Sequence, residues 1–282
     1  MKPRITIKNK RHLMETINDE IKLNGLECDL NHIDISKVID LTYLFDGSKF
    51  NGDISQWDTS RVTSMQGMFR FSKFNGDISN WDTSKVNNME SMFCNSIFNG
   101  DISKWNVSKV NNMTEMFSHS IFDGDISKWN VSSVTTMSYM FLESIFNNDI
   151  SKWNVSKVWD MQYMFCQSKF NGDISKWDVS KVGDIYFMFA ESNFNGDISN
   201  WNVSKVHNMD SIFAKSQFNG DISNWTPYKL YDCTNVFNNY NGMIPYWNIS
   251  EKKDRDKAIE VYQLRKELNA VGNDNVTKRF KI

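Results

Sequence analysis

Aspartate recurs at every twenty-fourth position along most of the chain, and a column of carboxylates has the chemistry to bind metal ions. A calcium ion takes about six to eight oxygen ligands, whereas each repeat supplies one carboxylate with no second one in reach. We therefore favour carboxylates that accept backbone N–H bonds within turns, with a calcium ladder as the alternative. The column comprises Asp53, Asp77, Asp101, Asp125, Asp149, Asp173, Asp197 and Asp221.

Other reactive side chains are not arranged for chemistry. A serine column also repeats, but no histidine stands near any of its members in the repeat frame, so serine catalysis is not predicted. The four cysteines form no C-x-x-C pair, and the four histidines lack neighbouring metal ligands. Cys94 and Cys166 hold one repeat position three repeats apart, about 14 Å by strand spacing, too far for a disulfide. The sequence predicts a protein that is not an enzyme and has no metal or cofactor.

The residues between the two ends repeat one phrase, for example FNGDISKWNVSKVNNMTEMF from Phe98. Its first phenylalanine returns every 24 residues, at Phe50, Phe74, Phe98, Phe122, Phe146, Phe170, Phe194 and Phe218. Such a period indicates units that stack and bury a continuous core. Degenerate units beginning at Leu26 and Tyr240 extend the array to residues 26–250, as nine full coils and one partial coil.

The apolar positions within a coil predict its local structure. The β-branched stretch I-x-x-W-x-[TV] favours a short strand around the tryptophan. The spacing V-x-x-M-x-x-M-F favours a helical or 3₁₀ turn with one face inward, and FNGD closes the coil as a turn. We interpret the tryptophan, methionine and phenylalanine columns as core packing.

Residues 1–25 are predicted to cover the first coil as an N-terminal cap made of a short strand and a helix. Asn9 suits the N-cap position, because its side-chain oxygen can accept a bond from the first helical turn. Leu13, Ile17 and Ile21 fall on one helical stripe and are predicted to face the array.

Residues 251–282 are predicted to form a C-terminal capping helix followed by a basic tail. Ser250 can cap this helix, which is expected to run to about residue 268. Val261, Leu264 and Leu268 are predicted to face the last coil.

The repeated pattern FNGDIS-x-W-[DN]-[VT]-S-x-V-x-x-M-x-x-MF-x-x-S resembles the BspA-like leucine-rich-repeat family of bacterial surface proteins, whose members also occur in mycoplasmas and viruses. The resemblance covers residues 26–250. It implies a leucine-rich-repeat-like right-handed solenoid. With the 24-residue period and the two predicted caps, the expected fold is an α/β solenoid, a right-handed stack of 24-residue coils with helical caps at both ends. It also implies protein or host-surface binding, with no catalytic residues to transfer.

Charge and hydropathy narrow the choice of partners. The net charge is −2, and residues 1–25 and 251–282 each contribute +3, which leaves −8 on the array. Phosphate binding needs a basic face, so nucleic acid is not predicted as a partner of the repeats. No apolar run reaches the roughly 20 residues of a membrane span. The start lacks a segment of signal-peptide type, which predicts a cytoplasmic location; the resemblance gives the cell surface or a virion as the alternative.

The coils differ from one another chiefly at the two residues before and the two after the first methionine of each coil. In the first three full coils these positions are small or polar, and in the next three they become aromatic. Three of the aromatic residues hold one repeat position and are expected to form a row about 10 Å long. The predicted binding residues are Tyr139, Trp159, Tyr163, Tyr186 and Phe187, with Asp160 and Asp184 beside them.

An exposed aromatic row with acidic neighbours is typical of a protein-binding hot spot. The leading hypothesis is a non-enzymatic interaction module that presents this patch to a protein partner. One alternative is a structural or assembly role through self-association, in a virion or surface layer. The other is glycan binding by an adhesin, because aromatic rings also stack on sugars.

Overall fold

The computed structural model of the chain describes residues 3–231, 233, 235–240 and 242–279. Within these residues, regular secondary structure is confined to four elements: β1 (Ile5–Thr6), α1 (Lys10–Asn24), β2 (Ile33–Asp34) and α2 (Lys252–Arg279). β1 and β2 pair in parallel, with Ile5 opposite Ile33. Neither helix of the described part is both long and apolar enough to cross a membrane.

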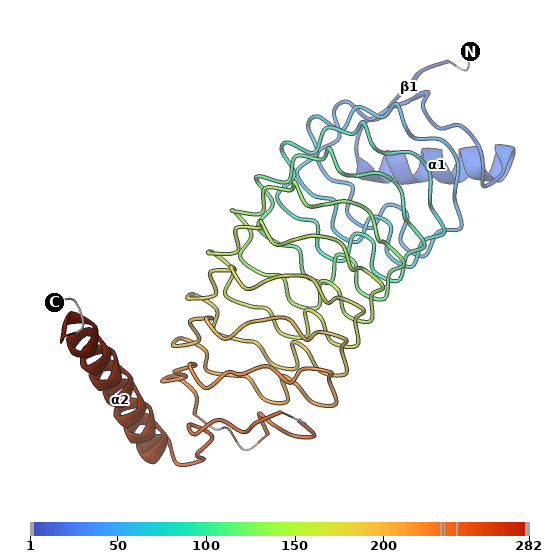
Figure 1. Cartoon of the computed structure of the whole chain (residues 1–282). Helices are drawn as coiled ribbons and strands as arrows, with labels where there is room; N and C mark the ends of the chain where they lie inside the picture. Colours follow the sequence, from blue (N-terminus) through green and yellow to red (C-terminus); the bar gives the residue numbers. More distant parts are fainter. Residues whose placement is uncertain (1–2, 232, 234, 241, 280–282) are drawn as a thin grey trace.

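Between β2 and α2 the backbone winds through successive turns that stack on one another (Figure 1). Isolated parallel bridges join equivalent residues of neighbouring repeats in a register of 24 residues. The bridges link Asp40, Ser64, Asn88, Asn112, Thr136, Asp160, Asp184 and Asn208 in this order. We call the side of the stack that carries these residues the bridged face.

The core consists of the predicted columns. The repeated phenylalanine, tryptophan and methionine side chains are almost completely buried. Each indole N–H of this buried column also finds an acceptor in the preceding repeat; for example, Nε1 of Trp153 donates to the carbonyl oxygen of Ile126 at 3.1 Å. This bond satisfies the only polar group of a buried tryptophan.

The spacing between equivalent rings is not uniform across the stack. In the buried phenylalanine column, the rings of Phe98 and Phe122 lie 6.4 Å apart, centroid to centroid, and nearly parallel. Near the bridged face, the rings of Tyr139 and Tyr163 lie 4.7 Å apart. These surface rings are therefore packed more closely than the rings of the core column.

A ladder of asparagine side chains, with one aspartate, also joins the repeats. The side-chain oxygen of Asn75 accepts a bond from the backbone N–H of Asn99 at 2.8 Å. Asp123 takes the same place in its repeat and accepts from the N–H of Asn147 at 3.0 Å. These side-chain bonds add to nearby direct backbone bonds between repeats, such as that from the Lys73 N–H to the Ser48 oxygen at 2.9 Å.

The local prediction for the coil was wrong in two respects. The bridged residue lies well after the tryptophan in each coil, and the segment around the tryptophan forms turns, not a strand. The methionine segment forms linked turns in place of a helix: the N–H of Met68 bonds to the Met65 oxygen at 3.1 Å, whereas those of Met65 and Gly67 bond to the next repeat. A helix would keep these donors within the segment and leave the neighbouring carbonyls unpaired.

The N-terminal helix matches its prediction. Asn9 is the N-cap of α1 and accepts a bond from the His12 N–H, and Gly25 ends the helix at a φ of 87°. Leu13 and Ile17 are buried in the core, and Ile21 packs against it.

The face predicted for the C-terminal helix was wrong. Ile259 is buried, and the ring of Tyr262 stacks on Tyr246 at 4.2 Å, so this side of α2 meets the end of the stack. Val261, Leu264 and Leu268 lie on the other side and are 40%, 58% and 70% exposed. α2 also continues through residues that were predicted as tail, as far as Arg279; residues 280–282 lie outside the described part.

Candidate functional site

Three of the predicted aromatic residues occupy a strained backbone position. Tyr139, Tyr163 and Phe187 have φ angles of 59°, 55° and 52°, in the left-handed region. Gly67 holds the same repeat position with a φ of 58°. A non-glycine residue in this conformation costs roughly 1–2 kcal/mol. The position is left-handed in the other repeats as well, at Tyr43, Ser91, Glu115 and Ser211, so this conformation belongs to the repeat and not to the aromatic residues alone.

These rings form one contiguous group, which we call the aromatic cluster: Tyr139, Tyr163, Tyr186 and Phe187. The ring of Tyr163 stacks on Tyr139 at 4.7 Å and on Phe187 at 5.2 Å, which gives the row expected from the repeat spacing. Tyr186 meets Tyr163 edge-on at 5.3 Å. All four side chains are partly exposed. The cluster is therefore a group of surface rings that hold one another in place by ring contacts.

The sequence analysis missed the residues beneath the cluster. Cys166, Ala190 and Ala214 form a small buried group, against which Tyr163 and Phe187 pack. They occupy one repeat position, and their small size leaves room for rings to lie over them. The small side chains at this repeat position could have indicated the site from the sequence. Other repeats carry larger residues at the same position, which hid this trend.

Trp159 is separate from the cluster. Its side chain is 55% exposed, and no ring contact joins it to another aromatic residue of the described part. Its carbonyl oxygen accepts the N–H of Gly183 at 2.9 Å, which anchors its backbone in the stack. Trp159 is thus an accessible indole on a rigid support.

Asp160 is not the surface acid that the sequence predicted, because its side chain is only 6% exposed. Its carboxylate accepts a bond from the backbone N–H of Gln162 at 3.1 Å, which closes a turn. Burial, with a smaller contribution from the charge of Asp184, raises the pKa of Asp160 above its usual value. Asp184 remains partly exposed and accepts a bond from the Asn208 amide at 3.1 Å.

The electrostatics around the rings are acidic. Burial, followed by the neighbouring Tyr186 hydroxyl, raises the pKa of Tyr163 to about 12. The pKa of Tyr139 is raised by burial and then by the charges of Asp160 and Glu115. The raised pKa values of Tyr139 and Tyr163 thus reflect burial first and neighbouring groups second.

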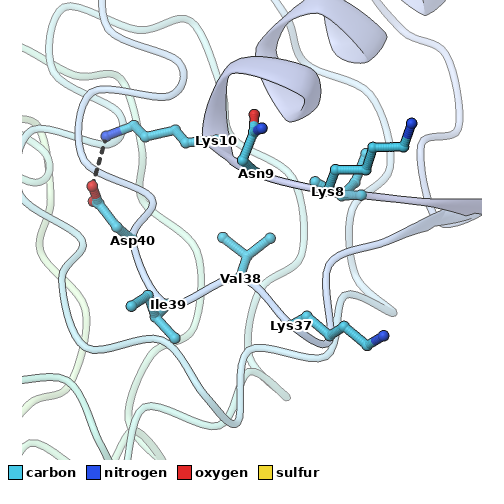
Figure 2. Close-up of a pocket in the computed structure, with 8 residues that line it drawn as sticks. Lys8, Asn9, Lys10, Lys37, Val38, Ile39 and Asp40 are labelled. Atoms are coloured by element: carbon cyan, nitrogen blue, oxygen red, sulfur yellow. Dashed lines mark hydrogen bonds and ion pairs between the residues drawn. The ribbon is translucent and has the colours of Figure 1, made fainter.

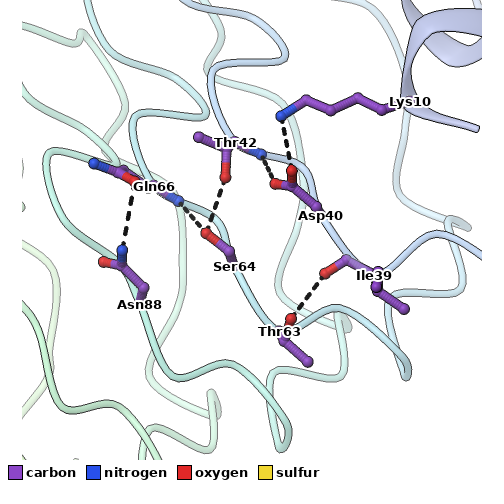
Figure 3. Close-up of polar contacts among 8 residues, drawn as sticks. All are labelled: Lys10, Ile39, Asp40, Thr42, Thr63, Ser64, Gln66 and Asn88. Atoms are coloured by element: carbon purple, nitrogen blue, oxygen red, sulfur yellow. Dashed lines mark hydrogen bonds and ion pairs between the residues drawn. The ribbon is translucent and has the colours of Figure 1, made fainter.

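The N-terminal part of the same face is polar. Figure 3 shows hydroxyl and amide groups that pair across repeats, among them Thr42 with Ser64 at 2.9 Å. The amide of Asn88 donates to the Gln66 side-chain oxygen at 3.5 Å. These hydroxyl and amide groups form hydrogen bonds with one another within the stack. Along its length, the bridged face therefore changes from paired polar residues to aromatic ones.

A second aromatic group at the N-terminal end was also missed. The guanidinium of Arg70 lies 5.0 Å from the ring centre of Tyr43 and 5.3 Å from that of Phe71. Asp46 binds the same guanidinium through two bonds, of 3.0 and 2.8 Å. The four residues come from two neighbouring repeats and from three repeat positions. A comparison of equivalent positions, one at a time, therefore does not show that they lie together.

Figure 2 shows a pocket of about 270 Å³ between the start of α1 and the first coil. Lys8, Lys10 and Lys37 are among the residues that line it. Lys10 is paired with Asp40 at 3.0 Å, and Asn9 already caps the helix. Asp40 is the only acidic residue that lines the pocket, and Lys10 already pairs with it, so we do not take the pocket as the candidate site.

The aspartate column serves the turns, as the favoured interpretation predicted. The N–H of Ser103 donates to the Asp101 carboxylate at 2.9 Å, and the same arrangement recurs along the column. This backbone bond is the main reason that the pKa of Asp101 lies below its usual value. Repulsion from Asp125 acts in the opposite direction and is the smallest of the effects. In the described residues, no group of three or more potential ligands could hold a metal ion. Cys94 and Cys166 are buried thiols and do not pair.

The strained backbone of the cluster leads to a direct test. We expect Tyr163→Gly to be more stable than Tyr163→Ala by about 1 kcal/mol, because both variants lose the ring contacts but only alanine keeps the strain. Gln162, which is not at positive φ, serves as the control, and there alanine should be more stable than glycine. Urea unfolding of the four variants measures both differences. The same order at both positions would contradict the strain.

The 24-residue register and its ladders of identical side chains define a repeat protein. The chain belongs to the family described as "Mycoplasma protein of unknown function, DUF285", whose model matches residues 13–121, 94–193 and 166–270. The three overlapping matches follow from the tandem repeats. No curated protein and no solved structure matched the chain.

Proposed function

We propose that this protein is a non-enzymatic interaction protein, which binds a protein partner through the aromatic cluster and Trp159. The observation that supports this most is the stacked row of partly exposed rings formed by Tyr139, Tyr163 and Phe187. The same repeat position holds glycine, serine or glutamate in other repeats, so the scaffold does not need a ring there. Exposed aromatic groups on a rigid scaffold are characteristic hot spots of protein interfaces.

We further propose that the scaffold is a leucine-rich-repeat-like right-handed solenoid of the BspA type. The repeated phrase and the 24-residue register support this assignment. Stacked repeats present extended surfaces that bind partners, and the cluster lies beside the bridged residues of one such surface. A left-handed winding in a crystal structure would contradict the assignment.

The chemistry of the cluster favours a partner that presents basic side chains beside apolar ones. Asp184 and Glu115 lie near the rings, and no Lys or Arg of the described residues is ion-paired with either carboxylate. The chain itself places Arg70 over the rings of Tyr43 and Phe71 at the other end of the face. We expect a partner's guanidinium or ammonium group to use the cluster in the same way.

Stacking within the cluster disfavours the glycan alternative. A sugar binds the open face of an aromatic ring, whereas Tyr163 is sandwiched between Tyr139 and Phe187. Of the five aromatic residues of the proposed surface, only Trp159 offers a ring without an aromatic neighbour among the described residues. A protein partner can use ring edges, hydroxyl groups and the exposed indole together.

The test is capture of partners from a native host with the intact chain and two double variants. Trp159→Ala with Tyr163→Ala alters the proposed surface. Phe71→Ala with Tyr231→Ala is the control, because these side chains are 52% and 77% exposed elsewhere. A partner held by the wild type and the control should be lost with the first variant. With purified components, the loss should reach about 2 kcal/mol, roughly 30-fold, and binding should weaken as salt rises.

Two results would contradict this function. Equal binding of that partner by both double variants would mean that the interface lies outside the cluster. If no protein is captured, but the wild type assembles in light scattering and the cluster variant does not, the surface serves the assembly role instead.

A further inference from the structure

α2 has two apolar sides, of which the stack covers only one. Ile259, Tyr262 and Lys266 are three and four residues apart, and this side meets the stack: Ile259 is buried, Tyr262 stacks on Tyr246, and the Lys266 ammonium donates to the Asn224 oxygen at 3.1 Å. Figure 1 shows the helix standing beside the last repeats, with its other side turned away from them.

The outward side carries a continuous aliphatic stripe, formed by Val261, Leu264 and Leu268. Residues three and seven positions apart lie on one face of a helix, opposite to the side that meets the stack. Their exposed fractions of 40%, 58% and 70% increase away from the stack. Leucine and valine at this spacing are the inward positions of a coiled-coil heptad.

Charged residues border the stripe in a self-complementary way. Glu260 directly precedes Val261, and Arg265 directly follows Leu264, so the two charges flank opposite edges of the stripe. Both side chains are exposed, and neither forms an ion pair with another described residue. In a parallel two-helix coil, residues with this separation pair between the two helices.

We propose that the α2 stripe is an interface with a second copy of this chain, in which the two helices pair in parallel about a two-fold axis. Leu264 then meets Leu264 of the second copy, and each Glu260 meets the other copy's Arg265. An isologous contact of this kind needs one self-complementary patch, and the charges around the stripe supply it. The stack lies on the opposite side of the helix, so each copy leaves the stripe of the other accessible.

The contact is short, because three aliphatic side chains from each copy form it. It belongs to the small, transient class of interfaces, with a dissociation constant on the order of 100 μM. The dimer would present two aromatic clusters, which would strengthen binding to a partner that carries two matching sites. The inference itself does not depend on the proposed function, because the two surfaces are separate.

Sedimentation velocity of the full chain over a range of concentrations provides the test. The wild type should shift from monomer to dimer as its concentration rises to several hundred micromolar. Glu260→Arg alone and Arg265→Glu alone should each weaken association by roughly tenfold or more, because each creates like-charge contacts. An equimolar mixture of the two variants should associate as the wild type does, since every pair becomes complementary again.

Leu264→Glu should abolish the dimer, whereas Leu23→Glu should not, because Leu23 is an exposed leucine on α1, 81% accessible and far from the stripe in the sequence. Circular dichroism confirms that each variant remains folded. Three results would overturn the proposal: a wild type that stays monomeric throughout, a dimer that is indifferent to Leu264→Glu, or charge variants that do not associate when mixed.

Discussion

Trp153→Ala should lower the free energy of unfolding by about 3–5 kcal/mol, the usual effect of removing a large buried aromatic side chain. The indole of Trp153 is 3% exposed and lies 6.5 Å from the stacked ring of Trp177 in the next repeat. The variant would lose these contacts and leave a cavity between repeats. It would also leave the buried carbonyl of Ile126 without its indole donor.

The matched control is Trp159→Ala, only six residues further along the chain. This indole is 55% exposed, so we expect a change within about 0.5 kcal/mol. Thermal and urea unfolding of both variants measure the difference. If Trp159→Ala proves as damaging as Trp153→Ala, Trp159 contributes to the core, and its role in the proposed binding surface is wrong.

Arg255→Ala should be the most damaging single change at the C-terminal end, at about 3–5 kcal/mol for the docking of α2. The guanidinium of Arg255 is completely buried. It donates to the carbonyl oxygens of Ile249, at 2.8 Å, and of Leu230. Removing it would leave buried acceptors unpaired and open a cavity between α2 and the last repeat.

Arg265→Ala is the control, because Arg265 is an exposed arginine of the same helix. Limited proteolysis and the near-ultraviolet dichroism of the stacked Tyr246 and Tyr262 report whether α2 remains docked. We expect early cleavage in α2 and loss of the tyrosine signal for Arg255→Ala only. Equal protease resistance of the two variants would mean that the buried guanidinium does not hold the helix in place.

The repeat period and the helix-capping residues of the sequence were sufficient to predict part of this structure. The 24-residue period placed the phenylalanine and tryptophan columns in the core, because residues equivalent in sequence must become equivalent in space when units stack. Capping chemistry located α1 between Asn9 and Gly25. The same equivalence placed Tyr139, Tyr163 and Phe187 in one row. Their role in binding stays a prediction.

The tertiary structure decided what depends on contacts between repeats. The methionine segments send alternate N–H groups to the next repeat, so the bridges lie beside the methionines and not around the tryptophans. A position that varies between repeats can still be buried. Asp160 is an example, because its carboxylate accepts the backbone N–H that closes the turn. The outward stripe of α2 arises because Ile259 and the buried guanidinium of Arg255 determine which side docks. Helical periodicity identifies the two apolar sides of α2, but only the shape and the unpaired carbonyls of the last repeat select between them.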